Sequence, residues 1–349
     1  MSRVLFILKR REDYNSIVHS HLGLSTGLFN SASFVSDMLL SSGIESKLVV
    51  VADNNCIDRE VTQYRPTHVI IEALWVVPSK FAVLQKLHPR VKWIIRLHSE
   101  MPFMAGEGMA MDWLGDYSDF KNIIIGVNAP RMTREVKKYL QIRNNWTSEQ
   151  LETRVIYLPN YYPQDYVSKK LNKKKDTIDI ACFGAIRPLK NHMVQAVAAL
   201  DFANQIGKKL RFHVNSGRIE MQGQPTINNL LGFFEQLSDT GHQMINHQWA
   251  PRADFLKICA TMDIGMQCNF SETFNIVSAD LISQGVPIVG CTEIPWAVKF
   301  CCANPTSSED MVRKLKLAYR FPWANVKGNQ VELSDYTNKT AKIWTKYFT

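Results

Sequence analysis

Short apolar runs alternate with amphipathic helical patterns along almost the whole chain. In the first half, strands are expected at 4–8, 47–51, 68–72, 92–98, 122–127 and 155–158, and helices at 26–40, 78–88, 109–117 and 130–141. Runs of this length that are bounded by turn residues are typical of buried strands. Strand–helix alternation predicts a parallel sheet with helices on both faces.

The same alternation begins again after a polar, lysine-rich stretch at 161–176, which is interpreted as a linker. Strands are expected at 178–183, 210–215, 243–247, 264–267 and 286–289, and helices near 190–206, 226–237, 251–260, 273–284 and 308–319. Residues 336–347 predict a final amphipathic helix after a loop that contains Pro322. The sequence therefore predicts an α/β fold with two Rossmann-like, doubly wound domains that face each other across a cleft.

The expected domains are 1–160, which would bind the second substrate, and 161–329, which would bind a nucleotide, followed by a C-terminal segment at 330–349. In open parallel sheets, ligands bind beyond the carboxyl ends of the strands. Gly27, His98 and Asn128 fall at such positions in the first domain.

Composition narrows the class of protein. No apolar run approaches the roughly 18 residues that a membrane span needs, so no stable membrane insertion is expected. The seven cysteines include no C-x-x-C pair, which favours buried free thiols in a reducing cytosol over a disulfide framework or a zinc site. We expect a cytoplasmic protein, in the host cytoplasm if the protein is viral.

The net charge of +9 and the pI of about 9.1 permit nucleic acid, an anionic membrane or phosphorylated ligands as partners. Part of this charge lies in the lysine run at 169–175, which is interpreted as a solvated segment.

Two cations follow the first strand of the second domain. Gly184 allows a sharp turn, and Arg187 and Lys190 then stand at the mouth of the next helix, where they suit a diphosphate. In an isolated R-x-x-K pattern, the two cations more often only keep a loop in contact with solvent. A second polar stretch at the same sheet edge makes a binding site the better interpretation.

That second stretch, 269–290, is predicted to form a loop, a helix opened by 271–273 and ended by Gly285, and a buried strand. A helix start presents backbone N–H groups, which bind anions. Glu272 and Asp280 lie eight residues apart. Around a helix this spacing places them about 80° apart, so both side chains can border one cleft.

These elements resemble the retaining glycosyltransferases of the GT-B fold, in particular family 4. That family has a Gly-Arg-x-x-x-x-Lys element, a Glu-Gly-Phe-Gly element with a second Glu eight residues after the first, and a Gly-x-Pro-Val-Val strand. The matching residues here are Gly184, Lys190, Glu272, Phe274, Asp280 in place of the second Glu, and 285–289. The first domain adds weaker matches at 25–27, His98 and 158–160, and the final helix resembles one that returns to the first domain.

Besides Asp280, the sequence departs from the family at three further positions. Ala185 occupies the position of the arginine, so Arg187 is the candidate replacement. Thr273 and Asn275 replace the two glycines of the donor loop, which makes them the candidates for setting the choice of sugar.

The resemblance implies roles for individual residues. Lys190 and Arg187 would neutralise the leaving diphosphate, Glu272 would bind the donor sugar, and Asp280 would bind the ribose. His98 would contact the donor sugar or the acceptor, although a histidine after a strand is often structural. The expected donor-binding residues are Gly27, Gly184, Asn215, Ser216, Arg218, Trp249, Thr273, Phe274, Asn275 and Asp280, of which Trp249 has a core role as its alternative.

With these cations in place, neither a metal nor a resident cofactor is expected, and the co-substrate is a nucleotide-sugar, with a UDP-sugar as first choice. The first long loop supplies the candidate acceptor-binding residues Lys9, Arg10, Arg11 and His21. The expected acceptor is a 5-hydroxymethyl pyrimidine in duplex DNA, as for phage DNA glycosyltransferases of this fold. The alternatives are a glycan or lipid-linked sugar at the cytoplasmic membrane face, and a non-catalytic nucleotide-sugar or polyanion binder.

Overall fold

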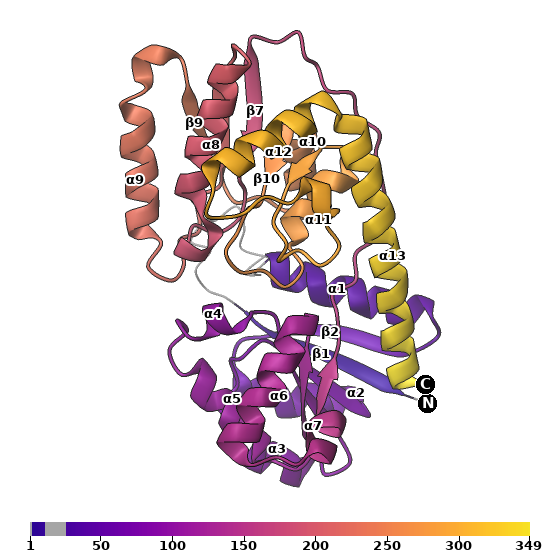
Figure 1. Ribbon diagram of the computed structural model, residues 1–349. Coiled ribbons are helices and arrows are strands. Elements are labelled where there is room, and N and C mark those ends of the chain that lie inside the picture. The colour runs from indigo at the N-terminus through magenta and orange to yellow at the C-terminus, as the bar shows by residue number, and fades with distance from the viewer. Residues whose placement is uncertain (1, 11–25) are drawn as a thin grey trace. The chain divides into compact units, whose positions relative to one another are not determined.

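The computed structural model describes residues 2–10 and 26–349, and it divides the chain into two compact units (Figure 1). Unit 1 comprises Met1–Pro163 and Thr337–Thr349, and unit 2 comprises Gln164–Tyr336. The sequence predicted that the first domain ends at residue 160 and the second at residue 329. Each unit contains one parallel sheet, which confirms the predicted α/β class with two Rossmann-like domains.

The sheet of unit 1 has the order β2-β1-β3-β4-β5-β6. Its strands are β1 (Arg3–Lys9), β2 (Glu45–Val51), β3 (His68–Glu72), β4 (Lys92–Leu97), β5 (Ile123–Val127) and β6 (Val155–Tyr157). Its helices are α1 (Thr26–Ser41), α2 (Ile57–Tyr64), α3 (Lys80–Leu87), α4 (Met101–Met104), α5 (Ala110–Ser118), α6 (Pro130–Asn144) and α7 (Ser148–Arg154), and η2 (Asn54–Cys56) is a short 3-10 turn.

Residues of β1 divide between the two faces of this sheet. Leu5 and Ile7 join the core under α2, α3, α5 and α6, whereas Val4 and Phe6 join the core under α1 and the end of α13 (Pro322–Phe348). Successive strand residues point to opposite faces, so a strand that is apolar at every position requires helices on both sides. The continuous apolar run at 4–8 is therefore explained by burial on both faces.

The sheet of unit 2 has the order β11-β10-β7-β8-β9. Its strands are β7 (Thr177–Ala181), β8 (Lys209–Val214), β9 (Gln243–Asn246), β10 (Ile264–Met266) and β11 (Ile288–Val289). The helices are α8 (His192–Gln205), α9 (Gln224–Glu235), α10 (Arg252–Thr261), α11 (Ile276–Ser283) and α12 (Ser308–Arg320), with 3-10 turns η3 (Pro188–Lys190), η4 (Ser238–Thr240) and η5 (Lys299–Cys301).

A close approach of helix and sheet explains Gly265 in β10. Ile264 and Met266 point into the core with α8 and α12, and Gly265 points to the opposite face, toward Leu281 of α11. A Cβ on Gly265 would stand 2.4 Å from the Leu281 Cδ1 atom, which is far inside van der Waals contact. A side chain at this position would require Leu281 to move, so the glycine leaves room for the Leu281 side chain of α11 against the sheet.

The last helix differs from its prediction. Pro322 was expected in a loop before a helix at 336–347, but α13 begins at Pro322 and runs for 27 residues to Phe348. Proline is tolerated at the first position of a helix because the N–H that it lacks would have no partner there. Residues 337–349 pack in unit 1, where the Trp344 indole N–H donates to the Pro159 carbonyl at 2.8 Å.

Two other findings concern both units. All seven cysteines are free and six are buried, as the absence of paired spacing predicted. Within residues 2–10 and 26–349, no helix has both the length and the apolar character that crossing a bilayer requires.

Candidate functional site

The strand order of unit 2 places a topological switch point between β7 and β10. The chain passes from β7 to β8 and β9 on one side, and β10 and β11 lie on the other side. Ligands of open parallel sheets bind beyond the carboxyl ends of the strands at such a point. The two loops that leave this point, 182–191 after β7 and 267–275 after β10, carry seven of the twelve candidate residues of unit 2.

Gly184 occupies a backbone conformation that favours glycine, with φ of +122°. The Asn215 Oδ1 atom, at the end of β8, accepts a hydrogen bond from the Gly184 N–H at 2.7 Å. A Cβ on Gly184 would stand 3.9 Å from the Lys190 Nζ atom. The turn therefore brings the backbone of Gly184 close to the ammonium group of Lys190.

Lys190 and Glu272 form an ion pair that joins the two loops. The Asn269 amide also donates to the same Glu272 oxygen, Oε1, at 2.7 Å. The two charged side chains are only 11% and 9% exposed. The structure thus brings together the cation expected at the diphosphate and the carboxylate expected at the sugar, in a partly desolvated place where electrostatic interactions are strong.

The helix after Glu272 begins later than predicted. The sequence suggested that 271–273 open it, but α11 starts at Ile276 and Asn275 is its N-cap, with φ of +60°. The Asn275 Oδ1 atom accepts from the Ser278 N–H at 2.8 Å, and its amide donates to Gln267 at 2.9 Å. The stretch before Ile276 is therefore a loop that ends at the cap residue Asn275. Thr273 and Phe274 belong to this loop and precede the first helical turn.

We predict that Asn275→Ala lowers the free energy of unfolding by about 2 kcal/mol, through a lost cap and a left-handed backbone that alanine disfavours. Chemical denaturation of the purified variants measures this difference. Ser307→Ala is the matched control, because Ser307 also caps a helix, accepting from the Asp310 N–H at 3.1 Å, but has an extended backbone. It should cost about 1 kcal/mol. Equal losses would show that the backbone of Asn275 contributes nothing.

Phe274 anchors this loop from inside. Its ring is 1% exposed and packs near Trp296 and Tyr336, and the Trp296 indole N–H donates to the Phe274 carbonyl at 2.8 Å. Thr273 and Asn275, on either side, are 7% and 5% exposed. The loop geometry therefore depends on packing around the aromatic residue.

A second group of cations shares Glu220, which the sequence analysis did not select. Arg187 Nη1 lies 3.2 Å from a Glu220 carboxylate oxygen, and Arg218 pairs with the other oxygen. The loops after β7 and β8 are tied by backbone bonds between 186 and 218–220. The Arg218 guanidinium also lies 5.8 Å from the centre of the Trp249 ring. Arg187, Arg218 and Trp249 are therefore neighbours, with one carboxylate holding the two arginines.

Two other predicted donor residues have defined partners. Asp280 on α11 is 3% exposed and pairs with Arg252, the first residue of α10, a partner that the sequence analysis did not identify. The Ser216 N–H donates to the Asn246 side chain at 2.9 Å.

Of the predicted residues of unit 1, three are described near the first strand and helix. Lys9 and Arg10 are exposed at the end of β1, and Gly27 lies in the first turn of α1. Arg11 and His21, the other expected acceptor-binding residues, lie outside the described residues.

His98 follows β4 and belongs to a buried polar network. Its Nε2 atom contacts the Glu72 carboxylate. That carboxylate also accepts a hydrogen bond from Arg96 Nη1 at 3.1 Å. Arg96 and Glu72 are fully buried, and Arg96 Nη2 donates to Asn160 Oδ1 at 2.6 Å. Burial lowers the pKa of His98, and the nearby Arg96 charge lowers it further. Glu72 acts in the opposite direction but does not outweigh these effects. The neighbouring carboxylate therefore fixes the ring, and 13% of the side chain remains exposed.

Burial alone would raise the pKa of Glu72, but attraction to Arg96 and His98 outweighs it and lowers that pKa below its usual value. Glu72 is therefore an ionised carboxylate that holds a histidine and an arginine. Within the described ranges, no group of three or more His, Cys, Asp or Glu residues is arranged to hold a metal ion.

No family model matches the sequence. No curated protein matches it at a significant level. Solved structures do match. A UDP-forming α,α-trehalose-phosphate synthase from Burkholderia vietnamiensis superimposes with a TM-score of 0.64 over 100% of this chain and 96% of the other, at 11% identity.

HepE from Anabaena, in complex with UDP, matches with a TM-score of 0.61 at 9% identity, over 98% of this chain and 96% of its own. A trehalose-6-phosphate synthase that was studied for glycosyl transfer with retention matches with a TM-score of 0.65 at 13% identity, over 83% of this chain and 75% of its own. At these identities the likeness establishes the fold. The chain has the GT-B fold of these structures, as the sequence motifs indicated.

Proposed function

We propose that the chain is a glycosyltransferase that moves a sugar from a nucleotide-sugar, with retention, to an acceptor hydroxyl. The observation that carries this proposal is the Lys190–Glu272 pair beside Gly184, at the switch point of the sheet of unit 2. Similar structures bind UDP or form it, which supports UDP as the nucleotide.

In this proposal, Lys190 neutralises the negative charge that develops on the leaving diphosphate. An ammonium group has three N–H donors, so Lys190 contacts a phosphate oxygen while keeping its bond to Glu272. Arg187 adds a second cation, and Glu220 holds it in place. A charge that is fixed before the reaction stabilises the transition state without any reorganisation.

Glu272 and Asp280 are proposed to accept hydrogen bonds from hydroxyl groups, of the sugar and the ribose respectively. Asp280 is held by Arg252 and Glu272 by Lys190 and Asn269, so each carboxylate has a fixed orientation. His98 is proposed to contact the sugar or the acceptor from unit 1, with Glu72 setting its orientation.

A donor panel tests the function. UDP-, GDP- and ADP-sugars are incubated with the protein, and nucleotide release is measured with and without acceptors. Release that falls in Lys190→Met and Glu272→Gln but not in Lys257→Met supports the proposal. Lys257 is a suitable control because it is 78% exposed and pairs with Asp254 on α10. Tight donor binding with no release under any condition would indicate a non-catalytic binder.

The acceptor needs its own comparison. The 5-hydroxymethyl pyrimidine in duplex DNA and the membership of family 4 remain predictions of the sequence, and the likeness to the structures named above supports neither of them. Hydroxymethylated duplex DNA, phosphorylated sugars and a lipid-linked sugar form the acceptor panel, with the product identified by mass spectrometry. If sugar is transferred only to a phosphorylated sugar, the hypothesis of a DNA acceptor is wrong.

A further inference from the structure

A surface of cations and exposed apolar side chains lies at the amino-terminal edge of the sheet of unit 2. We call it the basic–aromatic surface, and it comprises Lys170, Lys173, Lys174, Lys208, Arg320, Leu317, Phe321 and Trp323. It includes residues just before β7 and β8, whereas the candidate donor site lies beyond the carboxyl ends of β7 and β10. The two regions therefore occupy opposite edges of one sheet.

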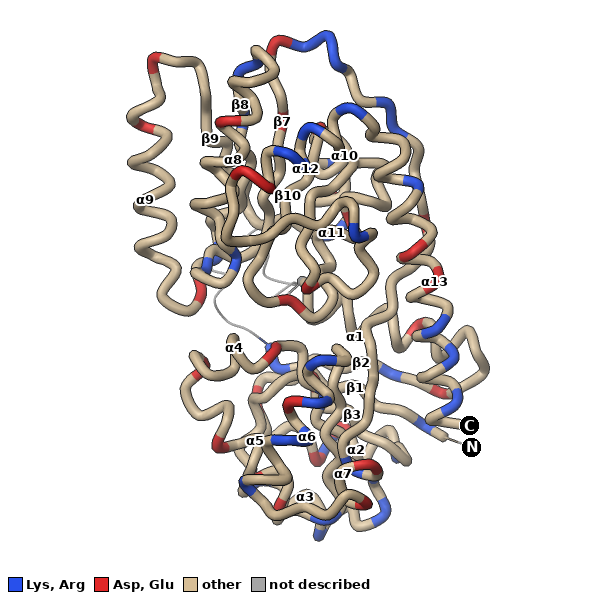
Figure 2. The backbone as a smooth tube through the Cα atoms, viewed as in Figure 1, with Lys and Arg blue, Asp and Glu red and all other residues tan. Residues whose placement is uncertain are grey.

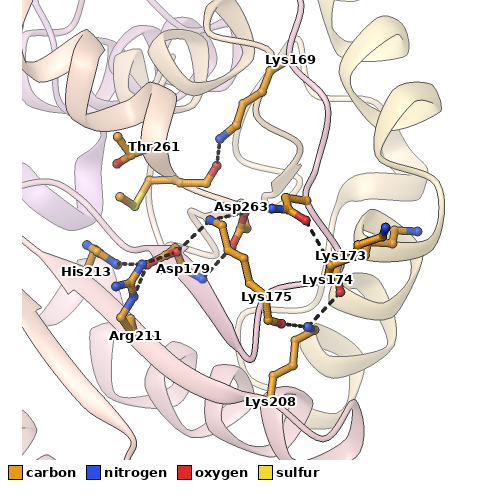
Figure 3. Close-up of polar contacts among 12 residues, drawn as sticks. Lys169, Lys173, Lys174, Lys175, Asp179, Lys208, Arg211, His213, Thr261 and Asp263 are labelled. Atoms are coloured by element: carbon orange, nitrogen blue, oxygen red, sulfur yellow. Dashed lines mark hydrogen bonds and ion pairs between the residues drawn. The ribbon is translucent and has the colours of Figure 1, made fainter.

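Partly buried contacts hold the lysine-rich stretch that leads into β7, whose lysines are blue in Figure 2. Lys169 donates to the Met262 carbonyl, and Lys175 lies 3.4 Å from Asp179 and 3.5 Å from Asp263 (Figure 3). The Val167 N–H also donates to the Ser283 carbonyl at 2.7 Å. The stretch is therefore attached to the domain, with Lys169 and Lys175 partly exposed and engaged in these contacts and Lys170, Lys173 and Lys174 exposed.

A chain of contacts connects these lysines to the end of α12. Lys208 donates to the Lys173 carbonyl at 3.0 Å, and Lys173 in turn donates to the Arg320 carbonyl at 3.4 Å. The Arg320 guanidinium lies 5.3 Å from the centre of the Phe321 ring. Lys208, Lys173, Arg320 and Phe321 are thus consecutive neighbours on one surface.

The corner between α12 and α13 exposes large apolar side chains beside this charge. Trp323 is 78% exposed, Phe321 51% and Leu317 38%. Pro322 begins α13 between the two aromatic residues, so the turn that presents them has a restricted backbone. A cluster of exposed aromatic and aliphatic side chains next to cations is typical of an interaction surface.

We propose that the basic–aromatic surface docks on an anionic lipid bilayer. Lysine and arginine are attracted to the negative surface of such a bilayer, and Trp323 and Phe321 suit the boundary between head groups and acyl chains. Duplex DNA would attract the same cations, but its backbone offers no apolar layer for Leu317, Phe321 and Trp323. This inference goes beyond the proposed function, because it concerns an edge of unit 2 that takes no part in sugar transfer.

Vesicle co-sedimentation of the full chain tests the proposal without any donor or acceptor. Vesicles of phosphatidylcholine with phosphatidylserine are compared with vesicles of phosphatidylcholine alone, at low and high salt. We expect binding to the anionic vesicles that weakens with salt. The charge-removing variants Lys173→Gln and Arg320→Gln should each weaken binding about fivefold. The double variant Phe321→Ser, Trp323→Ser should weaken binding by more than either of them.

Two variants of the same unit serve as matched controls. Leu231 on α9 is 51% exposed, like Phe321, and Lys257 is 78% exposed. Leu231→Ser and Lys257→Gln should leave binding unchanged, and thermal unfolding confirms that all the variants fold. Absent vesicle binding, or equal losses in the controls, overturns the proposal. A surface for nucleic acid would replace it if the same variants lost binding to duplex DNA and kept binding to vesicles.

Discussion

Lys190→Met is expected to lower the rate constant of sugar transfer about 10²- to 10³-fold, which is the effect of removing one preorganised group that stabilises developing charge. Methionine keeps most of the length of the lysine side chain but has no charge. Because the ammonium acts on charge that grows in the transition state, kcat should fall much more than KM rises. Steady-state kinetics with the donor found in the panel measures both constants, and Lys257→Met is the control.

The same substitution leaves Glu272 without its cation in a place where it is only 9% exposed. A buried charge without a partner destabilises the fold, so Lys190→Met alone mixes two effects. Adding Glu272→Gln removes the unpaired charge. The double variant should recover stability in chemical denaturation but should not recover transfer. Recovery of both would contradict the roles of Lys190 and Glu272 in transfer, and transfer by Lys190→Met within threefold of the unsubstituted chain would contradict the catalytic role of Lys190.

The placement of the candidate residues in unit 2 was predictable where it depends on sheet topology. Gly184, Lys190 and Glu272 each follow a strand, and the carboxyl ends of parallel strands share one edge, so alternation alone brought them to the same region. The partners were not predictable, because an ion pair depends on distances across separate loops. Glu220 and Arg252 have no spacing that marks them, and the structure shows them holding two of the predicted residues.

Local signals explain the other differences. Asn275 caps α11 from a left-handed conformation that asparagine adopts more readily than most residues, and this ended the loop four residues after Ser271. Pro322 was interpreted as a loop residue although proline is also common at the first position of a helix. In both cases a residue type has two ordinary positions, and tertiary packing decides between them.

The network around His98 shows a similar limit. His98 was selected because it follows a strand. Glu72, which contacts His98, and Arg96, which pairs with Glu72, lie within apolar strands and were interpreted only as strand residues. In a sheet buried on both faces, a charged residue at the end of a strand has to find a partner on the neighbouring strand. Glu72 and Arg96 are such neighbours, being paired in register across β3 and β4.

Arg96→Met is expected to lower the free energy of unfolding by about 3–5 kcal/mol, because it removes one partner of a fully buried ion pair. Arg96 also donates to the Leu158 and Pro159 carbonyls and to Asn160, so the loop after β6 loses its bonds as well. Chemical denaturation measures the loss. Arg143→Met is the matched control, since Arg143 and Asp116 are 39% and 45% exposed, and it should cost less than about 1 kcal/mol.

The dependence on pH provides an independent check of this ion pair. Because the folded-state pKa of Glu72 is lowered, its contribution to stability is present above its unfolded pKa and is lost as the pH falls through the folded value. Without Arg96, the pKa of Glu72 rises, so acid unfolding should begin at a higher pH in Arg96→Met than in Arg143→Met. Adding Glu72→Gln to Arg96→Met should remove this shift, since no carboxylate is then left to titrate. If the acid transitions of Arg96→Met and Arg143→Met coincided, the Arg96 charge would not be what keeps Glu72 ionised, and the stability loss would have to come from the lost backbone bonds.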